Sequence, residues 1–230
     1  MQLTVSGGQV THTQPQGILS GDHIGLSSAL AAQFPAYGNS VNLKQGDQPL
    51  TLDASCNGSF RAALTSLSQA AAQQALKSGA DRSSVGLLTI SGGQVTAVDL
   101  AAYVRAAGRQ KTPPAFDSLN LDTVENEDFG TRTVNARHFT TDGQQHTALS
   151  ATQRDLLTVK MMNPLNDIGD NAAQGAAHWR LRQGTADRDF SLAVLLILAT
   201  QLSHSGKDVH LALLWNIPHG GDDDLTQLFA

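Results

Sequence analysis

Two residues of complementary chemistry follow two apolar segments near the end of the sequence. Asp187 stands in the polar stretch "TADRD" (185–189), and His219 follows Pro218 in "NIPHGG" (216–221). A carboxylate that accepts the imidazole N–H of a histidine fixes the ring tautomer and stabilises the imidazolium. The other ring nitrogen is then placed to take a proton from a serine. This pair of residue types predicts a serine hydrolase, provided that the fold brings them together.

The elements predicted around these residues place both at one edge of a parallel sheet. Residues 178–184 predict a strand, 190–206 predict a largely apolar helix closed by a glycine, and 208–215 predict a second strand. Strand, crossover helix and parallel strand form a βαβ unit, and the loops after its strands lie at the same carboxyl edge. We therefore expect Asp187 and His219 to be neighbours in space.

Each residue also has an interpretation without catalysis. Asp187 or Asp189 could cap the helix that follows, and a histidine after a proline is often a surface-loop residue. A metal site built from His178, Asp187 and His219 is a further alternative, but these residues do not follow a metal-binding spacing. The order of aspartate before histidine on successive strand ends favours the catalytic interpretation. We expect no metal and no cofactor.

The first part of the chain, to about residue 160, is rich in Gln, Ser, Thr, Ala and Gly and predicts short helices. Helical spacing of apolar residues predicts helices over 58–81, 99–116 and 150–162, with Asp99 as the N-cap of the second. Buried strands comparable to those of the βαβ unit are not predicted there. A single βαβ unit needs neighbouring strands and a second helix layer, so the fold that the chain ends in looks incomplete.

A near-repeat, "LTVSGGQVT" at 3–11 and "LTISGGQVT" at 88–96, predicts two β-hairpins that turn at Gly-Gly. The alternative is a nucleophilic role for Ser6 or Ser91. A nucleophile elbow needs glycine two residues before and two residues after the serine, on a strand-to-helix turn. Threonine holds the earlier position in both copies, and no other G-x-S-x-G stands in the sequence. The nucleophile of a triad is therefore not found.

The composition is that of an ordinary globular protein. Hydrophobic residues make up 40% and charged residues 15% of the 230 positions, which is more apolar than a disordered chain. A formal net charge of −5 argues against nucleic-acid and anionic membrane partners. Cys56 is the single cysteine, so no intrachain disulfide forms. No signal peptide is recognised, which favours the cytoplasm if Met1 is the native start.

The end of the sequence closely resembles the C-terminal region of the bacterial tannases of the lactobacillus type, in "HWRLRQGTADRDFSLAVLLILATQL" and "VHLALLWNIPHGGDDDLTQLFA". These enzymes are α/β-hydrolase serine esterases that cleave galloyl esters. The stretches "KTPPAFDSLNLDTVENEDFG" and "NARHFT" resemble their inserted lid. The resemblance implies an α/β fold, the C-terminal portion of an α/β-hydrolase with an incomplete sheet and a large, mainly helical lid domain. The lid would span residues 1–160 and the core 161–230.

Carried over to this sequence, the resemblance implies that Asp187 is the triad acid and His219 the general base. Asp189 would bind a phenolic hydroxyl in the acyl pocket, and Lys111 and Glu125 would hold the other hydroxyls of the galloyl ring. The expected partner is a small galloyl ester or gallate. A site built on such hydrogen bonds rejects rings that lack the hydroxyls better than an apolar pocket would.

The sequence also departs from the family. The serine elbow, the oxyanion hole and the first strands have no counterpart in it, and Gly220, Asp223 and Gln183 replace residues that are common near the family's site. We therefore expect a fragment whose serine comes from an N-terminal half and which is inactive as an esterase alone. A non-catalytic module that binds aromatic acids and one chain of a split esterase are the alternatives.

Overall fold

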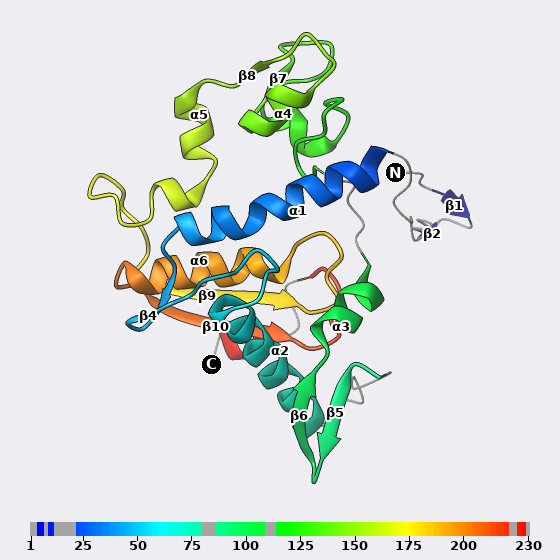
Figure 1. Ribbon diagram of the computed structural model, residues 1–230, viewed down its shortest axis with the longest axis vertical. Helices are drawn as coiled ribbons and strands as arrows, with labels where there is room; N and C mark the ends of the chain where they lie inside the picture. Colours follow the sequence, from blue (N-terminus) through cyan, green and yellow to red (C-terminus); the bar gives the residue numbers. More distant parts are fainter. Residues whose placement is uncertain are drawn as a thin grey trace.

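Helices alternate with small sheets in the computed structural model, which describes residues 4–6, 9–11, 22–79, 86–108, 114–220 and 225–228 (Figure 1). In chain order the elements are β1 (Thr4–Ser6), β2 (Gln9–Thr11), α1 (Asp22–Ser40), β3 (Lys44–Gln45), β4 (Gln48–Pro49), α2 (Ser59–Lys77), β5 (Leu88–Ser91), β6 (Gln94–Val98), α3 (Leu100–Ala107), η1 (Val124–Asp128), β7 (Arg137–His138), α4 (Thr141–His146), β8 (Thr152–Gln153), α5 (Leu156–Met161), η2 (Pro164–Asn166), β9 (His178–Gly184), α6 (Leu192–His204), β10 (Asp208–Leu214) and α7 (Leu225–Leu228). This mixed content is that of an α/β fold.

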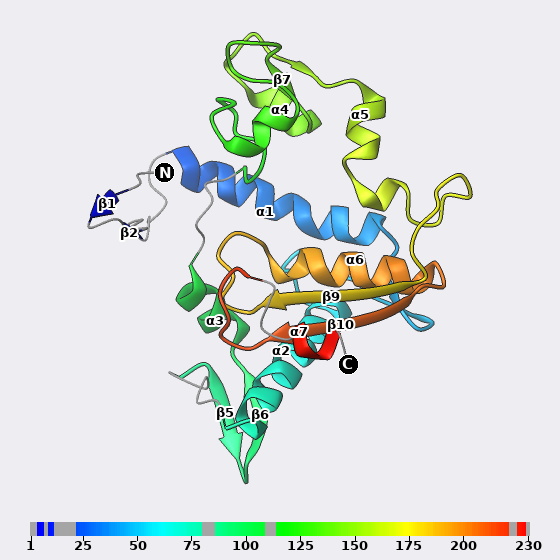
Figure 2. The same cartoon turned by 180° about the vertical axis from the view of Figure 1, so that it is seen from behind.

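A βαβ unit near the end of the chain contains the longest pair of strands. β9 and β10 pair in parallel along their whole length, with α6 as the crossover helix. The hydroxyl of Ser191 caps α6 by accepting from the N–H of Ala193, and Gly206 follows the helix at φ +79°. The predicted strand, helix, closing glycine and strand are therefore confirmed. Figure 2 shows α6 running along β9, with α2 on the side of β10.

Two predicted helices of the first part are present, and one is shorter than predicted. α2 lies within the predicted range 58–81. The carboxylate of Asp99 caps α3 by accepting from the N–H of Ala102, as expected. However, α3 occupies only the first part of the predicted range 99–116, because Gly108 leaves the helical conformation at φ +61°.

The predicted helix over 150–162 begins later than expected. Residues that follow Ser150 form β8, and the parallel pairing of β8 with β7 keeps them extended. α5 starts after Asp155, whose carboxylate accepts hydrogen bonds from the N–H and the hydroxyl of Thr158. The N-cap of this helix is therefore Asp155, and not Ser150 at the start of the predicted range.

The two near-repeats form antiparallel hairpins, as predicted. β1 pairs with β2 and β5 pairs with β6. The turn of the second hairpin contains Gly92 and Gly93, both at positive φ, directly after Ser91. A strand follows Ser6 and Ser91 in each copy, so neither serine stands on a strand-to-helix elbow.

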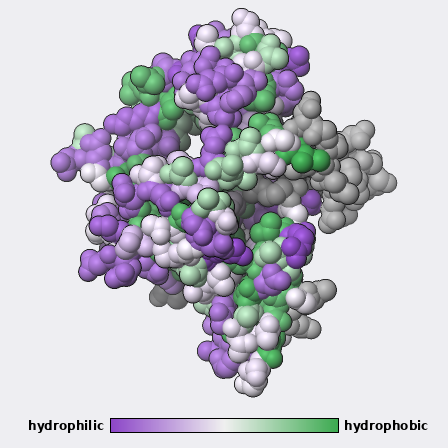
Figure 3. All heavy atoms as spheres, viewed as in Figure 1, coloured by the Kyte–Doolittle hydropathy of each residue, from purple (hydrophilic) through white to green (hydrophobic). Residues whose placement is uncertain are grey.

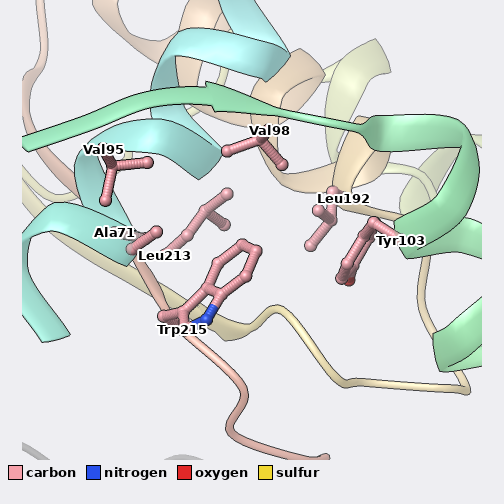
Figure 4. Packing of buried hydrophobic residues seen from close by; sticks show 8 residues of the cluster. Ala71, Val95, Val98, Tyr103, Leu192, Leu213 and Trp215 are labelled. Atoms are coloured by element: carbon pink, nitrogen blue, oxygen red, sulfur yellow. The ribbon is translucent and has the colours of Figure 1, made fainter. Parts of the chain in front are cut away.

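Two hydrophobic clusters join the first part of the chain to the βαβ unit. One lies between α2, β6, α3 and β10, where Figure 4 shows the ring of Trp215 beside Leu213 and Tyr103, and it contains Ala71, Ala72, Val95, Val98, Tyr103, Leu192, Leu213 and Trp215. The other lies against α6 and contains Leu43, Leu50, Leu52, Phe60, Ala193, Leu196 and Ile197. The apolar residues of α6 are thus shared between both clusters.

Residues 114–177, named here the loop-rich segment, have only short elements. In Figure 1, α4, α5, β7 and β8 of this segment lie on the far side of α1 from the βαβ unit. Hydrophilic residues cover much of this segment in the view of Figure 3. Within the part of the chain that the structure describes, no helix combines the length and the apolar character needed to cross a membrane.

The loop after β10 passes very close to the end of β9. A Cβ atom added at Gly184 would overlap the carbonyl oxygen of Ile217 and would lie 2.5 Å from that of Pro218. A Cβ added at Gly175 would meet only the Trp179 ring, at 3.9 Å. Glycine at 184 is therefore a condition for the close approach of the two segments.

We predict that Gly184→Ala lowers the free energy of unfolding by about 1–3 kcal/mol, because the obstructing atoms belong to the backbone and cannot rotate away. The matched control Gly175→Ala is expected to stay within about 0.5 kcal/mol of the unchanged chain. Urea unfolding followed by circular dichroism measures both values. Equal midpoints for the two variants would contradict the close approach.

Candidate active site

A hydrogen bond joins the two residues whose chemistry the sequence singles out. Nδ1 of His219 lies 3.0 Å from Oδ2 of Asp187. The side chain of Asp187 is 5% exposed and that of His219 is 59% exposed. The carboxylate is thus anchored in the protein while the imidazole faces outward. In this orientation Nε2 is the ring atom that can exchange a proton with a bound molecule.

The loop after β9 holds the carboxylate of Asp187 in place. Its Oδ1 accepts hydrogen bonds from the backbone N–H of Asp189, at 2.8 Å, and of Phe190, at 3.1 Å. The N-cap of α6 is Ser191. The interpretation of Asp187 or Asp189 as the helix cap is therefore wrong, and Oδ2 of Asp187 is directed to His219.

Hydrogen bonds donated by backbone N–H groups tie the two loops to each other beyond the ends of the strands. The N–H of Ala186 donates to the carbonyl of Ile217 at 2.9 Å. The N–H of Asn216 donates to Oγ1 of Thr185 at 2.7 Å, and Asn216 has a left-handed φ of +56°. Because each loop is bonded to the other, Asp187 and His219 cannot move apart independently.

Tyr103 of α3 lies beneath these loops. It is 8% exposed, and its ring centroid is 6.1 Å from that of Trp215. Burial and, to a smaller degree, the charge of Asp187 raise the pKa of Tyr103 to about 12, against the opposite effect of a hydrogen bond with Thr185. Sequence reasoning missed Tyr103, since its apolar surroundings come from distant segments.

Two phenylalanines extend the site on the other side of the imidazole. The ring of Phe190 stacks on that of His219 with a centroid distance of 5.9 Å and an interplanar angle of 12°. The ring centroid of Phe116, from the loop-rich segment, lies 5.1 Å from that of Phe190. Sequence reasoning missed both rings, and the position of Phe190 directly after Asp189 was the one available signal.

Asp189 lies close to the hydrogen-bonded pair, as expected. One potential ligand atom from each of Asp187, Asp189 and His219 lies within 4.8 Å of the other two, a spacing that could hold a cation. The alternative metal site that includes His178 is wrong. His178 begins β9, at the end opposite to these loops, and its Nδ1 lies 2.9 Å from Asp208.

Of the two other residues expected to contact substrate, the structure describes the position of one. Glu125 lies in η1 and lines a cavity of about 400 Å³ together with Phe116, Phe129 and Phe139, among other residues. Phe116 therefore contacts both this cavity and the ring that stacks on the imidazole. Lys111 lies outside the described residues.

We predict that the stability of the folded chain declines as the pH rises from 10 towards 12, and that Tyr103→Phe removes much of this decline. The pKa of Tyr103 is about 12 in the fold against 10.0 for free tyrosine, so the neutral phenol is favoured in the folded state. Its stabilisation is complete below pH 10 and is lost as the phenol ionises, up to about 2–3 kcal/mol. Urea unfolding across this range tests it, with Tyr37→Phe, at an exposed tyrosine, as the control. If the free energy of unfolding of the unchanged chain and of Tyr103→Phe depended on pH in the same way, the prediction would be contradicted.

Comparisons with known proteins place these features in a family. No protein-family profile and no curated protein matches the sequence. Solved structures do match. The tannase from Lactobacillus plantarum is 41% identical with a TM-score of 0.88, over 93% of this chain and 46% of that chain. The tannin acyl hydrolase in complex with ethyl gallate is 40% identical with a TM-score of 0.86, over 93% and 47%.

A tannase from a second organism agrees with these. The Fusobacterium nucleatum tannase is 37% identical with a TM-score of 0.84, over 96% of this chain and 48% of that chain. The chain therefore spans about half the length of the tannases that it matches. Sequence identity and fold agree over nearly the whole of this chain, and it belongs, over the region that they share, to the family of the bacterial tannases.

Proposed function

We propose that this chain forms the part of a galloyl ester hydrolase that carries the acid and the base of a Ser-His-Asp triad. The observation that supports this most directly is the hydrogen bond between Asp187 and His219 at the ends of two adjacent parallel strands. Two of the related structures are complexes with ethyl gallate and with 3,4-dihydroxybenzoate, which supports a phenolic acyl group. The serine would be contributed by sequence outside these 230 residues.

In the proposed reaction, His219 acts first as base and then as acid. Nε2 takes the proton of the serine hydroxyl as its oxygen attacks the ester carbonyl, and Asp187 stabilises the imidazolium through Nδ1. The tetrahedral intermediate collapses when the imidazolium gives its proton to the departing alcohol, which leaves an acyl-enzyme. Water, deprotonated by His219, then attacks the acyl-enzyme, and the proton returns to the serine as gallate leaves.

The galloyl ring would be held by groups on both sides of the site. Asp189 stands beside the pair of Asp187 and His219, and Glu125 stands in η1. Their carboxylates would accept hydrogen bonds from phenolic hydroxyls, and Lys111 would donate to another. Residues 1–160 would act as the lid that holds the ring, and residues 161–230 would supply acid and base.

We predict that the purified 230-residue chain hydrolyses methyl gallate no faster than its own His219→Ala variant. A base and an acid cannot form an acyl-enzyme without a nucleophile, and the oxyanion donors of a complete site contribute a large share of the rate. Release of gallate, measured by chromatography, tests this. Hydrolysis that needs His219 and stops on treatment with a serine-directed fluorophosphonate would refute it.

We further predict that the chain binds methyl gallate, and that Glu125→Gln or Asp189→Asn weakens this binding about tenfold, since each removes a charged hydrogen-bond acceptor. Nuclear magnetic resonance titration of the ¹⁵N-labelled chain gives the dissociation constants. Glu127→Gln, at an exposed position of the same η1 turn, is the matched control and should change the constant less than twofold. Absence of specific binding would contradict galloyl recognition by this chain.

A further inference from the structure

A buried carboxylate in the loop-rich segment gathers four hydrogen-bonding groups. Asp117 is 1% exposed. Its Oδ1 accepts from Nδ2 of Asn126 at 2.9 Å and lies 2.8 Å from Nδ1 of His138. Its Oδ2 accepts from the backbone N–H of Thr140 at 3.0 Å and from the hydroxyl of Thr140. Asn126 and His138 are both 0% exposed, so the cluster is closed to water.

The groups bonded to Asp117 come from three different elements. Asn126 belongs to η1, His138 to β7, and Thr140 is the N-cap of α4. A Cβ added at Gly143 would overlap the Asp117 carboxylate, so α4 also packs directly on this group. Elements of two to six residues gain little stability from their own hydrogen bonds. Their relative arrangement therefore depends on the shared carboxylate.

Two of the residues that line the cavity in this segment stand next to members of the cluster in the chain. Phe116 precedes Asp117 in the chain, has a φ of +71°, and packs its ring at a tilt against that of Phe190 beside the imidazole. Glu125 precedes Asn126, and it lines the same cavity as Phe116. A shift of the Asp117 cluster would therefore move a ring wall and a carboxylate of the site together.

We propose that Asp117 is a positioning residue that sets Phe116 and Glu125 for recognition of a hydroxylated aromatic ring. This inference rests on the proposed function. A buried polar cluster contributes less to stability than apolar packing of the same volume, but it admits fewer arrangements, because each donor must meet its acceptor. Asp117 touches no substrate, and its effect on specificity passes through Phe116 and Glu125.

The test compares two ligands that differ in ring hydroxyls, methyl gallate and methyl 4-hydroxybenzoate. The unchanged chain is expected to bind methyl gallate at least about tenfold more tightly, because the site is built to bond hydroxyls. In Asp117→Asn an amide N–H₂ must face N–H or O–H donors, and the ratio of the two dissociation constants should fall below about threefold. If a variant is partly unfolded, the apparent dissociation constants of both ligands rise by the same factor. Their ratio therefore reports positioning alone.

Should Asp117→Asn fail to fold, a pair of variants at Thr140 removes one donor to the carboxylate while keeping the shape of the cavity, which Thr140 also lines. Thr140→Ser keeps the hydroxyl donor and should keep the ratio, while Thr140→Val removes it and should reduce the ratio at least about threefold. Leu202→Val, in the core of α6 at 2% exposure, serves as the stability control and should lower the melting temperature with an unchanged ratio.

The outcomes separate this inference from the function on which it rests. Suppose that the unchanged chain prefers methyl gallate, and that the ratio of dissociation constants changes less than twofold in Asp117→Asn or in Thr140→Val. This result overturns the positioning role and leaves galloyl recognition intact. An unchanged chain that does not bind methyl gallate, or that binds both esters equally, overturns the proposed recognition itself. A ratio that falls in Asp117→Asn and Thr140→Val, but not in Thr140→Ser or Leu202→Val, supports the proposal.

Discussion

Hydrogen bonds continue to join the two segments past the ends of β9 and β10, and the candidate site depends on them. Asn216 bonds to Thr185, and Ala186 bonds to Ile217, in segments that a sheet would ordinarily leave as free loops. Gly184 makes the close approach of these segments possible. The distance between an aspartate and a histidine far apart in sequence is thereby set by hydrogen bonds between the two loops, one of them to the hydroxyl of Thr185, and not by the two side chains alone.

The rest of the chain completes this arrangement from two sides. Tyr103 and Trp215 pack below the loops in the cluster that also contains Leu213 of β10. Phe116 reaches the imidazole from the loop-rich segment through Phe190. The hydrogen-bonded pair therefore stands where α3, the loop-rich segment and the βαβ unit meet, and its surroundings cannot be assigned to the βαβ unit alone.

The sequence predicted the βαβ unit well because two alternating strands and an apolar helix of ordinary length leave few other arrangements. From that order it also predicted the proximity of Asp187 and His219. The predicted end of α3, at residue 116, was wrong. Helical spacing continues beyond Gly108 in the sequence, but this glycine takes φ +61° and ends the helix. Phe116 and Tyr103 could not be predicted, since stacking and burial depend on a left-handed backbone and on packing between distant segments.

Within the described residues, β9 and β10 pair only with each other, and this small sheet has a consequence for how the chain behaves in solution. Each outer edge presents backbone N–H and C=O groups that can template the addition of another strand. A sheet of this kind can grow by accepting a further strand at either edge. The same edges can also join two copies of the chain, so addition of a further strand and self-association would compete for the same backbone groups.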